Sequence, residues 1–302
     1  MTILITGASG IFGRAAVEGL LQHMPAGEII AMTRQPAKLA DLAERGVQVR
    51  YGDFDDAASI TQAAAGADKM LLISASKVGK RIPQHRNAIS GAVAAGIKHI
   101  IYTSYVGKMP NPSLAVSDHR ATEELLRESG VIWTVLRNTQ YSDAVVEAQS
   151  PAALKSGQWI SSSGDGRMAQ VTRRDCIDSA VAVLTSEGHR NTVYEITGPE
   201  LLTFREISQI IAELAGRPIE YIPVDDDGMY AFFDSLGIPR SADSEGVVNG
   251  FPWCSDDMTS VERALRLGCM EVISDHVKLL IGREPQSLRS FATERQDNLR
   301  NA

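Results

Sequence analysis

Three glycines near the start of the chain have the spacing of a dinucleotide-binding turn. Gly7, Gly10 and Gly13 follow an apolar run at residues 3–5 and precede an amphipathic pattern at residues 11–23. Where such a turn joins a strand to a helix, backbone N–H groups meet a pyrophosphate at the helix N-terminus, whose dipole favours negative charge. The three glycines would allow, in order, the tight turn, the close approach and the packing of helix on strand. The spacing departs from the usual G-x-G-x-x-G, so an ordinary glycine turn is the alternative.

Two residues that follow later strands indicate which dinucleotide would bind. Arg34 follows an expected strand at residues 28–33, about 20 residues past the glycines, where an Asp or Glu would bind a ribose 2′-hydroxyl. A guanidinium there suits a 2′-phosphate instead. We therefore expect NADPH rather than NADH, unless Arg34 is a solvated surface residue. Asp53 follows the strand at residues 47–51 and would either accept a hydrogen bond from the adenine or cap the next helix.

Small and hydroxyl-bearing side chains follow the next two expected strands, at residues 69–73 and 98–103. Residues 74–76 would pass under the ribose and nicotinamide, where small side chains allow close approach. Residues 103–105 could supply hydroxyls near the reacting carbon. The two tyrosines there, Tyr102 and Tyr105, could instead be packing residues at the sheet edge.

A dedicated proton donor is not evident in the sequence. A short-chain dehydrogenase carries Tyr-x-x-x-Lys on the helix expected here at residues 114–129, and Ala115 and His119 occupy those positions. The tyrosyl acid is therefore missing. His119 could donate a proton or hold the ribose, or it could be a surface residue beside Asp118. A reductase of quinones or dyes could act without such an acid, because hydride transfer depends mainly on proximity and orientation.

Short apolar strands alternate with amphipathic helices as far as Asn138, which is typical of βαβ units. We expect an α/β fold with a Rossmann-type, doubly wound parallel sheet. The expected domains are a Rossmann domain at residues 1–198, whose residues 139–166 contribute to the substrate cleft, and a smaller substrate-binding lobe at 199–302. A capping box of Thr203 and Glu206 opens one helix. Further expected strands are residues 133–137, 193–196 and 219–224, and further helices are residues 83–95 and 174–187.

The composition restricts the class of protein. A net charge of −7 over 302 residues argues against nucleic acid as a partner. The apolar start is too short for a secretory signal, and no run approaches the roughly 18 apolar residues of a membrane span. Cys176, Cys254 and Cys269 have no C-x-x-C spacing, and the six histidines show no ligand pattern. We therefore expect reduced thiols, no metal site and a cytoplasmic protein.

Taken together, several stretches resemble the NmrA-like atypical short-chain dehydrogenase/reductase family, and most of all its branch of bacterial NAD(P)H:quinone oxidoreductases and triphenylmethane reductases. The resemblance implies a Rossmann domain with a small C-terminal lobe, NADP(H) along the strand ends and substrate between the two. The family has no dependable Tyr-x-x-x-Lys pair, so its absence does not argue against activity. The matching stretches are residues 5–13, 34–38, 71–79, 83–87, 101–104, 136–138, 141–142, 193–195, 279–282 and 285–288.

The motifs and the resemblance together give the candidate site residues. The resemblance places the phosphate loop at residues 7–13 and the nicotinamide side at residues 74–76 and 138–141. The candidate catalytic side chains are His119, Tyr141 and Ser104. The expected cofactor contacts are Thr6, Gly7, Ser9, Gly10, Ile11, Phe12, Gly13, Arg34, Lys38, Asp53, Phe54, Ser74, Ala75, Ser76, Thr103, Asn138, Thr139 and Tyr141.

We expect an NADPH-dependent reductase that transfers hydride directly to a quinone or a related conjugated aromatic or carbonyl compound, as a monomer or homodimer. No second nucleotide motif suited to a flavin is present. Two alternatives stay open: a non-catalytic NAD(P)-binding redox sensor, and a reductase of another carbonyl or imine. Five residues of the tail could line a pocket for a flat substrate or form the core of the lobe: Phe232, Phe233, Phe251, Pro252 and Trp253.

Overall fold

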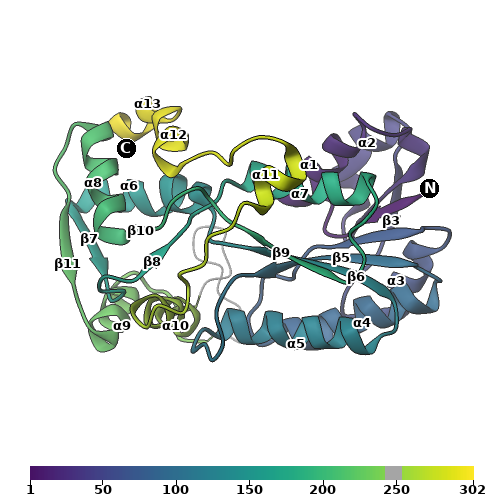
Figure 1. Cartoon of the computed structure of the whole chain (residues 1–302), viewed down its shortest axis with the longest axis horizontal. Helices are drawn as coiled ribbons and strands as arrows, with labels where there is room; N and C mark the ends of the chain where they lie inside the picture. The colour runs from purple at the N-terminus through teal and green to yellow at the C-terminus, as the bar shows by residue number, and fades with distance from the viewer. Residues whose placement is uncertain (242–253) are drawn as a thin grey trace.

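The computed structural model describes residues 1–241 and 254–302 and contains a large parallel sheet beside a smaller region (Figure 1). The sheet has seven strands in the order β3-β2-β1-β4-β5-β6-β9, and every neighbouring pair is parallel. This confirms the expected doubly wound α/β fold. The strands are β1 (Ile3–Ile5), β2 (Ile29–Thr33), β3 (Gln48–Tyr51), β4 (Lys69–Leu72), β5 (His99–Tyr105), β6 (Ile132–Asn138) and β9 (Thr192–Ile196).

Helices cover both faces of the sheet. One face carries α1, α7 and α11, which pack against one another, and the other carries α3, α4 and α5 in a row (Figure 1). The central strands β1, β2 and β4 are buried on both sides, which is why they read as apolar runs, whereas β3 and β9 at the two edges of the sheet are less buried. The bounds are α1 (Ile11–Leu20), α2 (Ala40–Glu44), α3 (Ala57–Ala64), α4 (Arg81–Ala94), α5 (Leu114–Glu128), α7 (Arg173–Thr185) and α11 (His276–Ile281), with short 3₁₀ turns η1 (Ala26–Glu28) and η2 (Pro36–Leu39).

Successive residues of one strand supply two different cores. Ile3 and Ile5 of β1 join the cluster that includes α1 and α7, whereas Leu4 joins the cluster that includes α3 and α4. The chain order reverses at β1, because β1 pairs with β2 on one side and with β4 on the other. Ligands of such sheets bind outside the carboxyl ends of the strands at this switch point. The loops after β1, β4, β5 and β6 are therefore the ones that can form a site.

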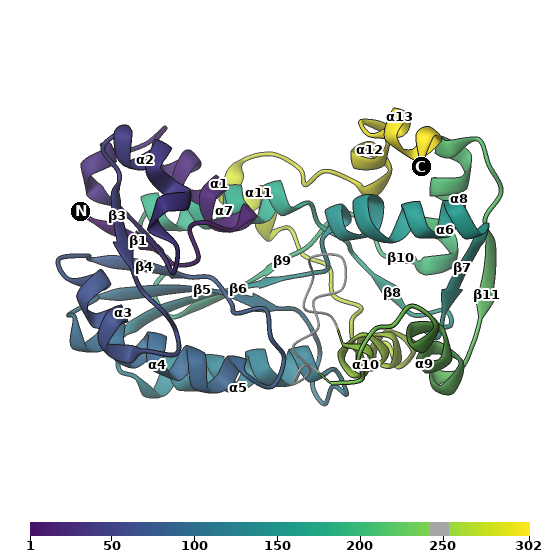
Figure 2. The ribbon, with the colours of Figure 1, turned by 180° about the vertical axis from the view of Figure 1, so that it is seen from behind.

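The chain leaves the sheet after β6, returns for α7 and β9, leaves again, returns once more for α11 and then leaves for the C-terminal helices (Figure 2). These excursions form one smaller region, in which β7 pairs with β11 and β8 with β10. Val145, Leu154 and Trp159, which follow β6, share a core with Phe204, which follows β9, and with Phe291, which follows α11. The elements are η3 (Ala144–Gln149, a π-helix), α6 (Ser150–Ser156), β7 (Gln158–Ser161), β8 (Arg167–Met168), β10 (Leu202–Thr203), α8 (Phe204–Ala215), β11 (Glu220–Pro223), α9 (Asp226–Ser235), α10 (Ser255–Arg266), α12 (Leu288–Thr293) and α13 (Gln296–Asn301).

The expected strands are confirmed to within two residues at each end, and so is the capping box of Thr203 and Glu206. The helix after the glycine turn ends at Leu20, earlier than residue 23. The helix cap that we considered for Asp53 belongs to Asp56 instead, because the Asp56 carboxylate accepts from the first N–H groups of α3. Residues 144–168 pack with the residues after 199. The division of the chain at residue 198 stays a prediction.

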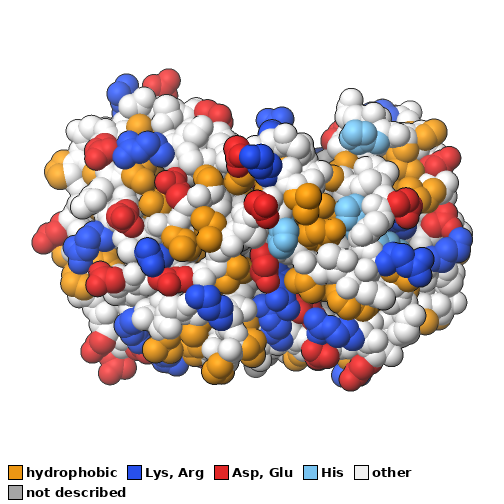
Figure 3. Space-filling model, in the orientation of Figure 1, with side chains coloured by type: hydrophobic (Ala, Val, Ile, Leu, Met, Phe, Trp, Pro, Cys, Tyr) orange, Lys and Arg blue, Asp and Glu red, His pale blue; other side chains and the backbone are white. Residues whose placement is uncertain are grey.

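Charged side chains of both signs are interspersed on the face drawn in Figure 3. That face therefore presents a mixed rather than a single-sign electrostatic surface. None of the helices within residues 1–241 and 254–302 combines the length and apolar character that crossing a membrane would require.

The Gly/Ser-rich stretch before β8 packs so closely on α10 that we expect Gly166 to tolerate no side chain. A Cβ at Gly166 would lie 2.1 Å from the Leu265 carbonyl oxygen. Gly166→Ala should therefore lower the free energy of unfolding by about 1–3 kcal/mol, measured by urea denaturation. Gly27→Ala is the matched control, since nothing lies within 4 Å of a Cβ there. Equal stability of the two variants would contradict the prediction.

Candidate functional site

The glycine turn has the shape that the sequence predicts. Gly7 has a φ of +58°, a left-handed conformation that residues with side chains rarely adopt. A Cβ at Gly13 would lie 2.5 Å from the Gly7 carbonyl oxygen, so α1 can start against the turn only if residue 13 is glycine. Gly10 is the extended N-cap residue of α1 and supplies no side-chain cap. The first N–H groups of α1 are thus available to an anion, as a pyrophosphate site requires.

Arg34 lies in the neighbouring loop with its side chain exposed. The Thr33 hydroxyl donates to Ser9 Oγ at 2.8 Å, which ties the end of β2 to the glycine turn. Lys38 is also exposed, and its carbonyl oxygen accepts from Arg14 of α1 at 3.1 Å. Within the described ranges the Arg34 guanidinium has neither a hydrogen bond nor an ion pair. Its charge is therefore available to a phosphate group.

Asp53 and Phe54 lie in the turn after β3. The Asp53 carboxylate accepts from the Asp55 N–H at 3.1 Å, and the Phe54 carbonyl oxygen accepts from Asn87 Nδ2 at 2.9 Å. The Phe54 ring packs edge-on against His85, with 6.2 Å between ring centroids. The turn is therefore anchored to α4, and the contact of Asp53 with an adenine stays a prediction.

Two threonines brace the strand ends on either side of the switch point. The Thr6 hydroxyl is fully buried, donates to the Leu71 carbonyl oxygen at 3.0 Å and accepts from the Ile73 N–H at 2.9 Å. Thr103 Oγ1 accepts from the Ser74 N–H at 2.9 Å. Both residues were expected as cofactor contacts. In the structure the Thr6 hydroxyl is engaged within the sheet edge, where it joins β1 to β4.

The loop after β4 is held by side chains of α4 and α5. The Ala75 N–H donates to His85 Nε2 at 2.9 Å, and the Ala75 carbonyl oxygen accepts from Arg81 Nε at 2.7 Å. Asp118 Oδ2 accepts from the Gly79 N–H at 3.0 Å. The sequence did not predict these roles of His85, Arg81 and Asp118. No local spacing shows which helix residues will reach back to a loop, and only residues 83–87 carried any signal, through the resemblance.

His119 is buried, so the interpretation of His119 as a surface residue is wrong. Its Nδ1 lies 2.7 Å from the hydroxyl of Tyr102, which is itself fully buried and packs as we considered for it. Burial, together with the charge of Arg81, holds the pKa of His119 well below its ordinary value, so the ring is neutral. Burial raises the pKa values of Tyr102 and Tyr105, so both phenols stay protonated.

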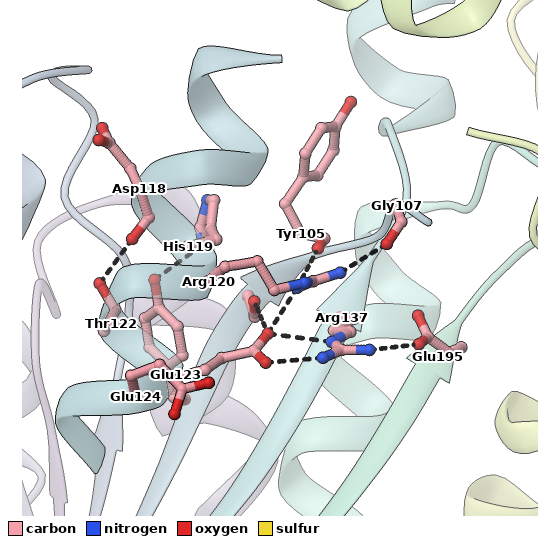
Figure 4. Close-up of polar contacts among 12 residues, drawn as sticks. Tyr105, Gly107, Asp118, His119, Arg120, Thr122, Glu123, Glu124, Arg137 and Glu195 are labelled. Atoms are coloured by element: carbon pink, nitrogen blue, oxygen red, sulfur yellow. Dashed lines mark hydrogen bonds and ion pairs between the residues drawn. The ribbon is translucent and has the colours of Figure 1, made fainter. Parts of the chain in front are cut away.

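Ser104 contacts a buried network of charges around Glu123. Figure 4 shows Glu123 of this network with Arg120 and Arg137. The Ser104 hydroxyl donates to Glu123 Oε1 at 2.7 Å, and the Glu123 side chain has no exposed surface. Arg137 donates to both oxygens of this carboxylate, at 3.0 and 2.7 Å, and Arg120 donates to Oε1 at 2.6 Å. Because the Ser104 hydroxyl already has this acceptor, the structure argues against the catalytic role that we expected for it.

The network extends from α5 to the ends of three strands (Figure 4). Arg137 of β6 also pairs with Glu195 of β9 at 2.9 Å. Arg120 donates to the carbonyl oxygens of Tyr105 and Gly107, at 3.1 and 2.8 Å. Burial alone would raise the pKa of Glu123, but hydrogen bonds from Arg137 and the charge of Arg120 lower it below its usual value. The carboxylate is therefore ionised and fixes the path of the chain after β5.

Residues 138–141 comprise the last residue of β6 and the three residues after it. Thr139 is structural, because its hydroxyl donates to the Ala169 carbonyl oxygen at 2.6 Å. Asn138 Nδ2 donates to the Tyr141 hydroxyl at 3.3 Å, and the Arg173 guanidinium lies 5.4 Å from the centre of the Tyr141 ring. Burial raises the pKa of Tyr141, so its phenol is a protonated group at this strand end. Its catalytic role stays a prediction.

A family model described as NAD(P)H-binding matches residues 7–187. The chain belongs to this family. It is 40% identical over 237 residues to quinone oxidoreductase 2 of Escherichia coli strain K12, an alignment that covers 78% of this chain and 82% of the relative. It is 27% identical over 240 residues to an NAD(P)H azoreductase of Xenophilus azovorans, covering 79% and 82%.

Solved structures of the family have the same fold. The crystal structure of the E. coli NADPH-dependent quinone oxidoreductase QOR2 with NADPH matches with a TM-score of 0.88 and 34% identity, over 99% of each chain. Triphenylmethane reductase of Citrobacter sp., complexed with NADP(H), matches with a TM-score of 0.85 and 32% identity, over 97% of this chain and 99% of the other. The resemblance to the quinone oxidoreductase and triphenylmethane reductase branch is confirmed.

The residues at the carboxyl edge fit the dinucleotide that the family binds. Ile11, in the first turn of α1, is 69% exposed although it is apolar, whereas Phe12 is buried in the core. Arg34 supplies a cation beside that turn. Asn138 Oδ1 and Gln140 Oε1 are buried and have no hydrogen-bond partner within the described part of the chain, and such acceptors suit an amide group like that of nicotinamide. The first turn of α1, Arg34, Asn138 and Gln140 are thus candidates to bind different parts of the cofactor, and these contacts stay predictions.

The aromatic residues of the tail lie partly within the lobe core. Phe233 is buried and forms a small cluster with Met229 and Ile238, against which Phe232 packs. This confirms the lobe-core alternative for Phe233. Residues 251–253, which include the other three aromatic-pocket candidates, lie outside the described residues. In the part of the chain that the structure describes, no group of three or more His, Cys, Asp or Glu side chains is placed to hold a metal ion.

The hydrogen bonds of His85 determine its tautomer and make the site loop sensitive to acid. Thr122 Oγ1 donates to the Asp118 carbonyl oxygen, so it accepts from Nδ1–H of His85, and Nε2 is the bare acceptor for Ala75. Burial, aided by the charge of Arg81, lowers the pKa of His85 to about 3, far below roughly 6.5 in an unfolded chain. Protonation would break the hydrogen bond to the loop.

We therefore expect His85 to contribute stability that is complete above pH 6.5 and is lost as the pH falls towards 3. Its share of the loss is about 1.4 kcal/mol of unfolding free energy for each pH unit. His85→Gln should flatten the pH dependence between pH 6 and 4 by this amount, measured by urea denaturation at several pH values. The exposed His23 gives a matched control, because His23→Gln should leave the slope unchanged. An unaltered slope in His85→Gln would refute the assignment.

Proposed function

We propose that this protein is an NADPH-dependent oxidoreductase that transfers hydride directly to a quinone or a related conjugated aromatic or carbonyl compound. The observation that carries the proposal is the match, over 99% of both chains, to a quinone oxidoreductase solved with NADPH. The exposed and unpaired Arg34 supports the choice of NADPH over NADH. A small-molecule substrate follows from this chemistry. The oligomeric state, monomer or homodimer, and a cytoplasmic location stay predictions.

The residues of the carboxyl edge have distinct tasks in this proposal. The first turn of α1 would hold the pyrophosphate and Arg34 the 2′-phosphate, while the loops after β4 and β6 would orient the nicotinamide. NADPH, when bound, supplies the hydride. Proximity and orientation then provide most of the rate acceleration. Because His119 is neutral and hydrogen-bonded to Tyr102, the weakly basic product of quinone reduction would take its proton from water.

Consumption of NADPH in the presence of quinones, triphenylmethane dyes and simple ketones tests the proposal. We expect NADPH absorbance to decay with quinones or dyes and to persist without an acceptor. A protein that binds NADPH but consumes it with none of these acceptors would instead be a redox sensor. Activity on ketones or imines alone would favour the other reductase that we considered.

Removing the Arg34 guanidinium should separate the two cofactors. Arg34→Ala should weaken NADPH binding by about 1.5–3 kcal/mol, the worth of a charge-assisted hydrogen bond, and should barely change NADH binding. Titration of both cofactors by fluorescence measures this. Arg86→Ala is the control, since Arg86 is exposed on α4 and should affect neither cofactor. Equal losses for NADPH and NADH in Arg34→Ala would contradict the role given to Arg34.

His119 allows a test of whether the reaction needs a protein acid. We expect His119→Ala to keep its turnover of quinones within about tenfold of the wild type, because water can protonate the product. Loss of a general acid would instead lower the turnover by about 100-fold or more. The variant should also retain the shape of the wild-type pH profile. Circular dichroism must show an intact fold, since the ring is buried. If a folded variant instead turns over about 100-fold more slowly than the wild type, His119 is the acid.

A further inference from the structure

Arg81 is the first residue of α4 and lies under the loop that follows β4. Two of its three guanidinium nitrogens bind this loop, since Nε donates to the Ala75 carbonyl oxygen at 2.7 Å and Nη2 to the Ser76 carbonyl oxygen at 3.3 Å. Its third nitrogen, Nη1, is buried and donates to no acceptor among residues 1–241 and 254–302. The Asp118 carboxylate lies 3.8 Å from Nη1 and is occupied by the Gly79 N–H.

A buried cationic nitrogen without an acceptor is costly, because it has lost its hydration and gained nothing in return. The side chain of Arg81 is only 11% exposed. The rigid, planar guanidinium binds two carbonyl oxygens of the loop through Nε and Nη2, and this geometry fixes the position of Nη1. The geometry therefore keeps one strong donor unsatisfied at the edge of the proposed site.

The surroundings of Arg81 place Nη1 where the sheet meets the lobe. The charge of Arg81 acts on Tyr105 of β5, on His119 of α5 and on Asp257 of α10. The backbone of Ala115, the position at which a short-chain dehydrogenase carries its tyrosine, also acts on the Asp257 carboxyl and lowers its pKa. The sheet, α5 and the lobe helix thus converge on Arg81. This is the region in which a substrate would lie against the nicotinamide loop.

We propose that Arg81 Nη1 donates a hydrogen bond to the substrate oxygen that becomes negatively charged during hydride transfer. The inference rests on the proposed function. A quinone that accepts hydride, with both electrons, from the cofactor becomes a hydroquinone monoanion, and water then supplies the proton. A preorganised donor at the position of the developing charge lowers the barrier to the first step. Arg81 thereby replaces the absent tyrosine as a stabiliser of charge, without transferring a proton.

A series of quinones whose hydroquinone anions differ in basicity tests the proposal. In Arg81→Met the loss in kcat should reach about 100-fold for the most basic anion and become smaller as the anions become less basic, because a hydrogen bond to a more basic oxygen is stronger. Arg81→Gln, which keeps an N–H donor for the loop but has no charge, should behave likewise. If circular dichroism shows that Arg81→Met does not fold, the result for Arg81→Gln decides the test. Arg86→Met controls for loss of an arginine from α4.

Binding of 4-nitrophenol gives a second readout that requires no turnover. Its phenolate has its own visible absorption band, so the ratio of phenolate to phenol can be measured while it is bound beside NADP⁺. The wild type and Arg86→Met should show a ratio about tenfold higher than the folded Arg81 variants, since a nearby cation favours the anion.

A merely structural role for Arg81 would produce a different result. The loss in kcat would then be equal for all quinones, and the nitrophenolate ratio would not change in the variants. Either finding overturns the inference. Failure of the proposed function can be distinguished from failure of this inference. If the proposed function is wrong, the wild type itself will reduce no quinone although it binds NADPH.

Discussion

The carboxyl edge of the sheet depends on one buried carboxylate. Glu123 has no exposed side-chain surface, and an ion taken out of water in this way is tolerated only when it is paired and fully hydrogen-bonded. Arg137 and Arg120 meet this requirement (Figure 4). Because Arg137 belongs to β6 and also pairs with Glu195 of β9, the network fixes α5 against three neighbouring strands. The loops that form the site start from strand ends whose positions this network sets.

The site contains two kinds of polar group: some form hydrogen bonds within the protein, and others have no partner among the described residues. Thr6 and His85 use their polar atoms to join neighbouring strands and loops. By contrast, the first turn of α1 has no side-chain cap, and Arg34 has no partner in the described residues. Such groups are not committed to contacts within that part of the protein, so they can bind an anionic ligand. In the proposed function, the cofactor would contact the groups that have no partner within the described part of the protein.

The smaller region contributes to the same edge, since its helix α10 meets the start of α5. Ser260 Oγ of α10 accepts from the Leu114 N–H at 3.0 Å. The N-terminus of α5 is therefore capped partly from the other region of the molecule. Since α5 also carries Asp118 and His119, the position of the lobe is coupled to the polar groups on the substrate side.

The sequence by itself determined the parallel sheet, the glycine turn and the position of Arg34. Each rests on local patterns: apolar runs mark strands buried on both faces, and only glycine adopts the φ of Gly7 without strain. Only the tertiary structure decided which hydroxyl groups and aromatic rings are available to a ligand. Ser104 and Thr6 read as site residues, yet their hydroxyls are bound inside the protein, while Arg81 and His85 reach the site loop from a helix. Hydrogen-bond partners far apart in the chain meet only when the sheet forms, and spacing along the sequence does not encode which of them pair.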